Sequence, residues 1–542
     1  MFKITDGKHA KNSVMTFRKI LALRPLLGFC LGCSVTALAT VGIVATARAQ
    51  DAAPHPSPTP QWRPVYHYTP HKNWTNDPNG LIYLNGEYLL YDQYNPFDYK
   101  WGHMSWGHAV SKDLVDWKEL AVAIPEIMGT DTTLRFSGSA VWDKNNSSGF
   151  CTSPKGCLVA IYTADQPALK RESQFVAYSN DGGISFRNYA GNPVVDLHMR
   201  DFRDPNVIWM EKDQRWLMTV ALPREHKVRF YGSHDLKSWD LLSEFGGDQG
   251  DTRRIWECPS LTPLPVDGDS SRIKWVLMVS SGNPDAQTGM QYFIGDFDGK
   301  TFTNNNAADV RLFVDEGNTF YAAIPWNNLP PGQHLLTGWL VPGSTPTYPW
   351  TGQMSIPRDL SLRTTGDGVR LFQEPAEMVR GELGKLSHGR VTRQKDLAIG
   401  DAGIDLGAAA HLTGNAYWVK AELTIGGAGA GVGGAAGSVA FRLPDQTIIG
   451  YDAVGHQLYI DKSHSDGLKV DTVMHHVPVE PVNGVLTLEI LVDRSSLEVF
   501  AGNGARVYTS MIYPGPGADG LSLSAKGGDF RVKELTIWNL GQ

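Results

Sequence analysis

The sequence predicts an all-β protein: a five-bladed β-propeller followed by a C-terminal β-sandwich. Gly (57) and Pro (32) are abundant in the 542 residues, and short apolar runs such as 158–162 and 275–279 alternate with turn residues. Helical periodicity is scarce. A loose repeat of short strands then favours a propeller, and the pattern changes near residue 371.

Residues 1–49 have the features of an export signal. Basic residues precede an apolar segment at about 26–47, which ends in the small-x-small pattern Ala47-Arg48-Ala49. An uncleaved membrane anchor is the alternative, because the segment approaches spanning length. Residues 50–61 form a Pro-rich leader. We therefore expect a secreted or periplasmic protein.

The charge of the remaining chain excludes several partners. Removal of residues 1–49 takes away seven basic residues and one acidic residue, which leaves 42 Lys and Arg against 55 Asp and Glu, a formal charge of −13. Such a chain is a poor candidate for binding nucleic acid or an anionic membrane. No later stretch is apolar enough to span a bilayer, so no stable membrane insertion is expected after signal removal.

Three cysteines remain after the signal. Cys151 and Cys157 flank a short loop, and in an oxidising compartment we expect them to form a disulfide. Cys258 is expected to be a free, buried thiol. No histidine lies near the cysteine pair, so a zinc site is not expected. No other metal and no cofactor are expected either.

Residues 62–370 carry the repeat and are predicted to form the propeller. Each unit opens with a polar or acidic residue on a turn, and two strands follow. The openings are Asp77, Ser137, Asp204, Glu257 and Tyr321, at intervals of 60, 67, 53 and 64 residues. In a propeller the first strand of each blade lines the axis, so these residues would converge on one funnel. A single large β-sandwich is the alternative.

The remainder of the chain is predicted to be a connector and a second domain. Residues 371–390 change in pattern and are assigned as a linker. Residues 391–542 contain alternating strands such as 485–492 and 496–500, which are typical of a β-sandwich.

Three acids at the unit openings are the candidate catalytic residues. Asp77, Asp204 and Glu257 each have a proline one or two residues later, and we expect them at equivalent turn positions. Carboxylates crowded together repel, so one of them acquires a raised pKa and can hold a proton near neutrality. Glycosidic cleavage needs such an acid beside an ionised carboxylate. Three independent turns that use acids for backbone hydrogen bonds are the alternative reading.

The motifs around these acids resemble those of glycoside hydrolase family 32, which contains invertases, inulinases and levanases. The resemblance covers essentially all of residues 62–542. It is carried by Asn76-Asp77-Pro78-Asn79-Gly80, Arg203-Asp204-Pro205, Glu257-Cys258-Pro259, Phe136-Ser137-Gly138-Ser139, Trp106–Ser111, Asp113–Trp117, Met354–Arg358 and Asp493–Phe500.

The resemblance implies a role for each acid. Asp77 matches the nucleophile, Glu257 the general acid/base and Asp204 the transition-state stabiliser, which with Arg203 would hold fructose hydroxyls. The reaction would retain configuration, with the two reacting carboxyl groups about 5–5.5 Å apart. Six further residues match positions around a fructose pocket: Asn76, Gln93, Trp101, Phe136, Ser137 and Trp339. Thr319 stands where the family often has Asp, and we expect it at the pocket entrance.

The implied function is an exo-acting β-fructosidase that hydrolyses terminal fructosyl units, with levan favoured over inulin and sucrose. A fructan or fructosyl oligosaccharide is the expected partner. A fructosyltransferase with the same site and a sugar acceptor is one alternative. A non-catalytic fructan-binding protein is another, although the presence of all three acids argues against it.

Overall fold

The computed structural model describes residues 56–281, 289–342, 347–426, 437–465, 475–518 and 520–541. The expected export signal and the first residues of the Pro-rich leader lie outside these ranges. Strands predominate in the described chain, which confirms the all-β prediction. None of the helices described is long and apolar enough to cross a membrane.

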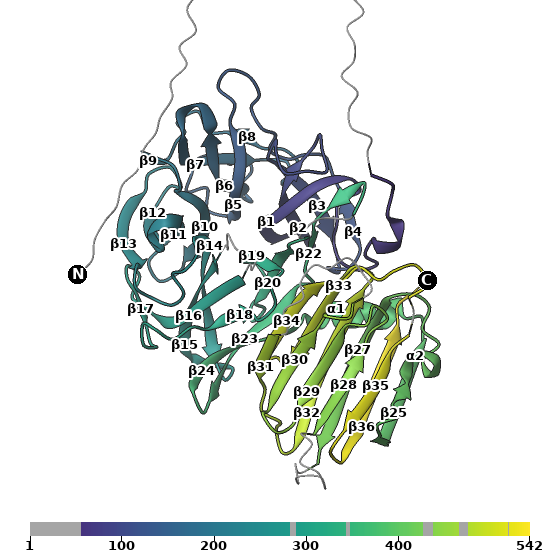
Figure 1. The fold of residues 1–542 in the computed structure, drawn as a ribbon. Helices are drawn as coiled ribbons and strands as arrows, with labels where there is room; N and C mark the ends of the chain where they lie inside the picture. Colours follow the sequence, from purple (N-terminus) through teal and green to yellow (C-terminus); the bar gives the residue numbers. More distant parts are fainter. Residues whose placement is uncertain are drawn as a thin grey trace, which may run out of the picture. The chain divides into compact units, whose positions relative to one another are not determined.

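The N-terminal region, up to Pro375, consists of four β-sheets in the described chain (Figure 1). The first sheet has the order β21-β1-β2-β3-β4, with β1 (Asn73–Leu84), β2 (Glu87–Asn95), β3 (Ser105–Ser111), β4 (Trp117–Glu119) and β21 (Trp350–Thr351). The second contains β5 (Leu134–Asp143), β6 (Cys157–Gln166), β7 (Arg171–Ser179), β8 (Arg187–Asn188) and β9 (Val195–Met199). The third has the order β10 (Arg203–Met210), β11 (Arg215–Leu222), β12 (Lys227–Ser233) and β13 (Asp240–Gly246).

The fourth sheet of this region has ten strands. These are β14 (Trp256–Val266), β15 (Asp269–Ser281), β16 (Gly289–Phe297), β17 (Phe302–Asn304), β18 (Phe313–Asp315), β19 (Phe320–Pro325), β20 (Leu335–Leu340), β22 (Gln353–Met354), β23 (Arg358–Thr365) and β24 (Gly368–Pro375). Its two halves are joined where β14 and β23 pair in parallel at Val266 and Leu362. Short 3₁₀ helices occur at Pro60–Trp62, Pro167–Leu169 and Pro223–Glu225.

Five strands form an inner ring. β1 contacts β5, β5 contacts β10, β10 contacts β14, β14 contacts β19, and β19 contacts β1. Figure 1 shows these strands around a common centre. The ring is also closed through β21, from late in the region, which pairs with the start of β1 in parallel at Asn73 and Trp350. Residues more than 200 positions apart in sequence therefore meet at this centre.

The burial of individual strands explains the two kinds of apolar pattern in the sequence. The first eight residues of β6 are all buried, because neighbouring sheets cover both of its faces. In β32 (Val485–Asp493), by contrast, Leu486, Leu488 and Ile490 enter a core, whereas Thr487 and Glu489 lie on the opposite face. Strands of this protein therefore arise both from continuous apolar runs and from segments in which apolar and polar residues alternate.

The C-terminal region begins at Val391 and contains two six-stranded sheets that share one core. The first has the order β25 (Val391–Ile399), β36 (Phe530–Asn539), β27 (Ala416–Ile425), β32, β33 (Ser496–Ala501) and β34 (Arg506–Met511). The second has the order β26 (Ile404–Asp405), β35 (Ser522–Lys526), β28 (Ser438–Arg442), β29 (Ile448–Asp452), β30 (Gln457–Asp461) and β31 (His475–Pro478). A four-residue helix, α2 (Leu406–Ala409), follows β26.

Residues 371–390, which the sequence assigns as a linker, contain the end of β24 and helix α1 (Glu377–Leu386). Val379 and Leu383 of α1 are buried in an apolar cluster that also takes in Tyr66 of the N-terminal region and Leu491 of the C-terminal region. The Arg380 side chain of α1 also makes a bidentate ion pair with Glu489 of β32, at 3.0 and 2.5 Å. This segment therefore joins the two regions through a shared core.

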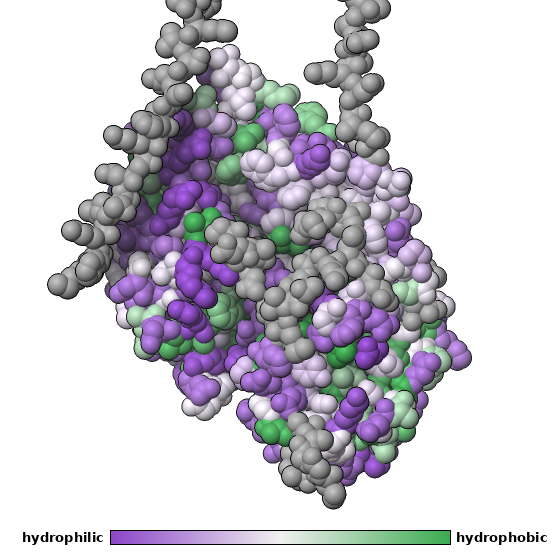
Figure 2. Space-filling view, in the orientation of Figure 1, coloured by the Kyte–Doolittle hydropathy of each residue, from purple (hydrophilic) through white to green (hydrophobic). Residues whose placement is uncertain are grey.

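The cysteines follow the prediction. Cys151 and Cys157 form a disulfide, and Cys258 is a free thiol that is buried. Figure 2 shows mainly hydrophilic and neutral residues on the face that it presents, with hydrophobic residues in small groups. Scattered apolar residues of this kind are typical of a water-exposed surface.

Candidate active site

A cavity of about 390 Å³ opens at the centre of the inner ring. All ten residues that the sequence predicts for the site line it: Asn76, Asp77, Gln93, Trp101, Phe136, Ser137, Arg203, Asp204, Glu257 and Trp339. Three further residues contribute to the lining and were not predicted as site residues: Glu172, Asp201 and Tyr321. The structure therefore brings together side chains that the sequence separates by up to 263 positions.

The backbone that presents the acids is a set of β-bulges. In each inner strand the pairing register shifts at the same place, where two residues oppose one residue of the neighbouring strand. The bulged pairs are 76–77, 136–137, 204–205, 258–259 and 322–323. A proline cannot donate to the ladder, so Pro205 and Pro259 suit a bulge. Asp204 and Cys258 adopt positive φ angles of 65° and 47° there.

The bulges correct one expectation from the sequence. The acids lie inside strands, and they do not occupy equivalent positions. Asp77 is the second residue of its bulge, Asp204 is the first, and Glu257 immediately precedes its bulge. Because side-chain direction changes from one strand residue to the next, this offset lets the three carboxyl groups approach the cavity from different directions.

Asp77 is held by two neutral donors. The Ser137 hydroxyl donates to Asp77 Oδ2 at 2.6 Å, and the Asn76 amide donates to Oδ1 at 3.0 Å. Asn76 is itself fixed by the Trp74 indole N–H at 2.7 Å. Burial raises the pKa of Asp77, although the hydrogen bonds from Ser137 and Asn76 oppose the shift. The carboxyl group is oriented firmly without being paired to a cation.

Asp204 lies deeper in the cavity and is 6% exposed. Its Oδ2 accepts a hydrogen bond from the Cys258 backbone N–H at 2.9 Å, and its own N–H donates to Thr163 Oγ1 at 2.9 Å. Burial raises the pKa of Asp204 to about 8, against the opposing effect of the Arg203 guanidinium. The cluster can therefore retain a proton near neutrality.

Glu257 is bound by a cation and a phenol. Arg203 contacts Glu257 Oε1 through Nε and Nη2, both at 2.9 Å, and the Tyr321 hydroxyl donates to Oε2 at 2.5 Å. The same guanidinium pairs with Glu172 and Asp201, each at 3.0 Å. Glu172 and Asp201 thus fix the plane of Arg203, and Arg203 fixes Glu257.

Cys258 connects two of the acids. Its Sγ lies 3.5 Å from Asp77 Oδ2 and 3.6 Å from Asp204 Oδ2. Burial raises the pKa of the Cys258 thiol well above its usual range, and the neighbouring Asp204 and Asp77 reinforce the shift. The group is therefore a protonated thiol that can donate weakly to either carboxylate.

Aromatic side chains form the walls of the cavity. Trp101 is 55% exposed at the rim and meets the Phe136 ring edge-on, with centroids 6.2 Å apart. Trp339 lies edge-on to Trp74, at 5.9 Å. Gln93 is buried, and its amide donates to the Arg135 carbonyl at 2.7 Å. Apolar faces with a few converging polar groups are typical of a site for a small polar ligand.

Some sequence expectations fail or fall short here. Thr319 is buried, its carbonyl accepts from the Val341 N–H, and it is not among the residues that line the cavity. The expectation that it borders the entrance is wrong, because Thr319 precedes β19 and only Tyr321 of that strand reaches the cavity. Tyr321 could have been found from the repeat, in which it opens the fifth unit. Glu172 and Asp201 carry no comparable sequence signal.

The described residues also contain one cluster with metal-ligand spacing, formed by Asp143, Cys151 and Cys157. Both sulfurs are used by the disulfide, so the cluster does not fit a metal ion.

Comparison with known proteins agrees with this site. The model of the glycosyl hydrolases family 32 N-terminal domain matches residues 67–375, and that of the family 32 C-terminal domain matches residues 382–539. The chain is 42% identical to a levanase of Bacillus subtilis (strain 168) over 513 residues, which cover 91% of this chain and 73% of the levanase. It is 37% identical to an extracellular exo-inulinase of Aspergillus awamori, covering 88% of this chain and 95% of that protein.

A solved structure confirms the likeness in three dimensions. The crystal structure of the exo-inulinase from Aspergillus awamori superimposes with a TM-score of 0.79, at 36% identity, over 89% of this chain and 98% of the exo-inulinase chain. Both halves of the chain match the family, and the range matched by the N-terminal domain contains all the residues that line the cavity. The chain therefore belongs to glycosyl hydrolase family 32 and is a glycoside hydrolase.

Proposed function

We propose that the protein is an exo-acting β-fructosidase that hydrolyses terminal fructosyl units of fructans, with levan favoured, then inulin and sucrose. The observation that carries the proposal is the convergence of Asp77, Asp204 and Glu257 in one cavity. The similar proteins include a levanase and an extracellular exo-inulinase.

Asp77 acts as the nucleophile in this proposal. It attacks the anomeric carbon of the terminal fructosyl unit, and a covalent fructosyl-enzyme forms while the glycosidic C–O bond breaks. The donors Ser137 and Asn76 orient the carboxylate without neutralising it. An ionised carboxylate is what an oxocarbenium-like sugar requires beside it, because positive charge develops there in the transition state.

Glu257 acts as the general acid/base. It gives a proton to the leaving oxygen and then takes one from the incoming water, so the configuration is retained. The separation between its carboxyl group and that of Asp77 is expected to be about 5–5.5 Å, as retention requires. Arg203 and Tyr321 hold both oxygens of Glu257, which fixes the direction of proton transfer.

Asp204 acts as the transition-state stabiliser. Together with Arg203 it binds the fructose hydroxyls, and both residues line the cavity. Burial raises the pKa of Asp204 to about 8, so the carboxyl group can also donate to a hydroxyl near neutrality. Trp101, Phe136, Trp339 and Gln93 complete the fructose pocket.

The same proposal includes the domain organisation and the location. Residues 62–370 form five blades, in which the ten-stranded sheet represents two blades bridged only at Val266 and Leu362, and residues 391–542 form the sandwich. The ring of five inner strands supports this count. Residues 1–49 act as an export signal, which the name of the extracellular exo-inulinase supports.

Product analysis tests the reaction. The purified protein is incubated separately with levan, inulin and sucrose, and product sizes are followed over time. We expect free fructose from the first time points, with no ladder of intermediate oligosaccharides from either polymer. Intermediate oligosaccharides from the polymers would indicate endo-cleavage, and longer oligosaccharides at high sucrose would indicate fructosyl transfer. Absence of any fructose release would contradict the proposal.

A further inference from the structure

A second cavity, of about 460 Å³, lies at the opposite ends of the inner strands. On β5, Ser137 lines the active-site cavity and Trp142 lines the second one. On β10, Asp204 and Trp209 are related in the same way. Each pair is five residues apart, which corresponds to about 16 Å along a strand. The second cavity is therefore separate from the catalytic acids.

Tryptophan dominates its lining. Trp142 and Trp209 are each partly exposed in the cavity. The Trp209 indole is fixed in place, because its N–H donates to Glu211 Oε2 at 2.7 Å and its ring meets that of Trp216 edge-on, with centroids 4.8 Å apart. Trp216 is buried and donates to Ser147 Oγ at 2.9 Å. The site thus presents rigid aromatic surface at little cost in side-chain entropy.

The charged groups of the cavity are mostly engaged. Both oxygens of Asp143 accept hydrogen bonds from Ser147 and Ser148. Glu211 accepts from Trp209 and Gln214. Lys144 has no carboxylate partner among the residues the structure describes. A metal ion would therefore find no available carboxylate pair here.

The other polar side chains that line the cavity are the amides of three asparagines. Asn327 donates to the carbonyls of Ala140 and Val207 and so closes the floor of the cavity between β5 and β10. Asn145 and Asn328 are exposed at its edge, and the Asn328 amide donates to the Tyr83 carbonyl at 2.8 Å. Aromatic surface with amide groups and a lone ammonium matches a neutral polyhydroxylated ligand, because sugar C–H faces pack on indole and hydroxyls bond to amides.

We propose that this cavity is a non-catalytic saccharide-binding site that holds a segment of the fructan whose end is cleaved at Asp77. The identity of the ligand as a fructan rests on the proposed function. Two sites on one protein raise the effective concentration of a long polymer at each of them. The second site should therefore strengthen the apparent affinity for polymeric fructan and leave the kinetics with sucrose unchanged.

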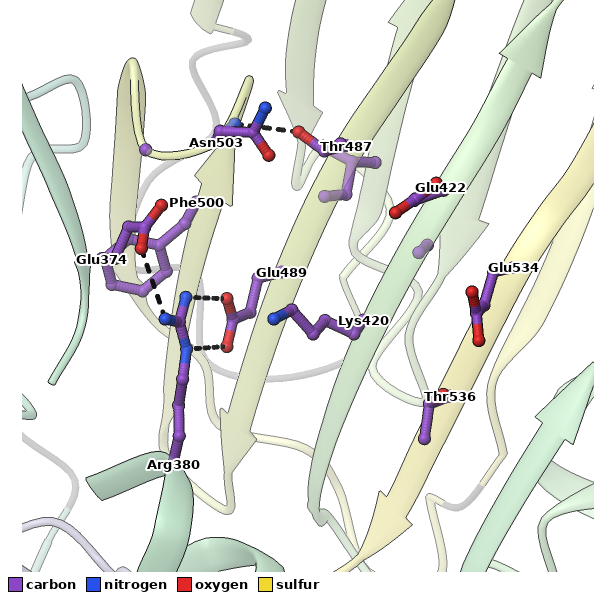
Figure 3. Close-up of a pocket in the computed structure, with 13 residues that line it drawn as sticks. Glu374, Arg380, Lys420, Glu422, Thr487, Glu489, Phe500, Asn503, Glu534 and Thr536 are labelled. Atoms are coloured by element: carbon purple, nitrogen blue, oxygen red, sulfur yellow. Dashed lines mark hydrogen bonds and ion pairs between the residues drawn. The ribbon is translucent and has the colours of Figure 1, made fainter. Parts of the chain in front are cut away.

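Another cavity of similar size, about 360 Å³, provides a matched control (Figure 3). It lies on the face of β32 that points away from the core of the C-terminal region. Figure 3 shows Arg380 between Glu374 and Glu489, with Lys420 extending toward Glu489. Its aromatic residue, Phe500, is only 2% exposed. This cavity is polar, but it offers no open ring among its described lining residues.

Affinity electrophoresis in native gels that contain levan, inulin or dextran tests the proposal. The Asp77→Asn background prevents cleavage of the polymer. We expect Trp142→Ala and Trp209→Ala each to weaken retardation by levan or inulin by about five- to tenfold. Lys420→Ala, in the control cavity, should leave retardation unchanged. With Asp77 restored, the tryptophan variants should hydrolyse sucrose with kcat and KM within twofold of the parent, and KM for polymeric fructan should rise.

Trp209 also packs against the core, so a second variant guards against misfolding. The combination Lys144→Ala with Asn328→Ala changes only exposed residues and should also weaken retardation. Unchanged retardation in all these variants, with fructan hydrolysis intact, would overturn the second site alone. Retardation by dextran but not by either fructan would overturn the assignment of the ligand. A parent protein that releases no fructose from any substrate would contradict the proposed function instead.

Discussion

Around the active-site cavity, five carboxylates line the wall, and Arg203 forms ion pairs with three of them, Glu172, Asp201 and Glu257. At the junction of the two regions, Arg358 and His67 together pair with three carboxylates, Asp315, Asp493 and Glu498. The side chains of Arg203, Asp201 and Glu257 remain 13–24% exposed to the cavity. At the junction, Arg358 donates to Glu498 at 2.6 Å, to Asp315 at 2.9 Å and to Thr509 at 2.7 Å. His67 bridges Asp493 and Glu498 at 2.8 and 2.9 Å. These side chains are fully excluded from solvent.

The difference appears in the titration of the acids. At the junction, Arg358 and His67 lower the pKa of Glu498 although burial opposes the shift, whereas burial raises the pKa of Asp315 in spite of Arg358. In the active site, burial raises the pKa of Asp77 and of Asp204, and Arg203 does not compensate. The junction satisfies its charges within the protein and stabilises the fold. The cavity leaves Asp77 and Asp204 without full compensation of their charge. In the proposed mechanism, these carboxyl groups are available to bind substrate hydroxyls and to stabilise the positive charge of the transition state.

The largest expected effect is a loss of catalysis when either of the two reacting acids is replaced. Asp77→Asn and Glu257→Gln should each lower kcat for sucrose by about 10³-fold or more, because each removes a reacting group. Circular dichroism should show an unchanged fold, since both substitutions are nearly isosteric. Near-normal turnover in either variant would exclude the assigned roles.

Breaking the junction cluster should affect stability instead. Arg358→Met leaves Asp315 buried without a cation and Glu498 with His67 alone, and such a loss costs about 3–5 kcal/mol. The free energy of unfolding in urea measures it. Arg363→Met removes a partly exposed pair with Glu374, 3.4 Å long, and should cost less than about 1 kcal/mol. Equal losses in the two variants would mean that the junction is not the stabilising cluster.

Removing the charge of Asp204 should stabilise the protein, in contrast to the loss of Arg358. The pKa of Asp204 is raised to about 8, so its contribution to stability is present below about pH 4 and is lost as the pH rises to about 8. Asp204→Asn, which cannot ionise, should stabilise the protein by about 1–2 kcal/mol at pH 8 while abolishing activity. The gain should vanish at pH 4. Thermal unfolding across this range checks the trend, and a destabilised variant at pH 8 would contradict it.

The smallest effect concerns the pH dependence of the junction. Burial opposes protonation of His67, but the hydrogen bonds that its ring donates to Asp493 and Glu498 raise its pKa to about 9. Its contribution to stability is complete below about pH 6.5 and is lost as the pH rises through about 9. His67→Gln should flatten the decline of Tm between pH 6.5 and 9. A decline as steep as that of the parent protein would show that His67 is not its source.

Much of the site could be predicted from the sequence because its signals are local. A proline next to an acid, repeated at similar intervals, marks Asp77, Asp204 and Glu257, and the motifs shared with the family add the wall residues. Two cysteines separated by a five-residue loop can hardly avoid one another, so the Cys151–Cys157 bond was also predictable. Each of these features depends on residues that are close along the chain.

The tertiary structure alone decided how the distant parts meet. The offset of the three acids depends on the pairing register of each inner strand, which local sequence does not determine. Glu172 and Asp201 matter only because Arg203 reaches them, and His67 and Arg358 only because β33 lies beside both. The sequence by itself determined the all-β fold and the identity of the acids, since short-range patterns encode strands and turns. Their spacing, their protonation and the second cavity are set by burial and by contacts across hundreds of residues, which only the folded chain creates.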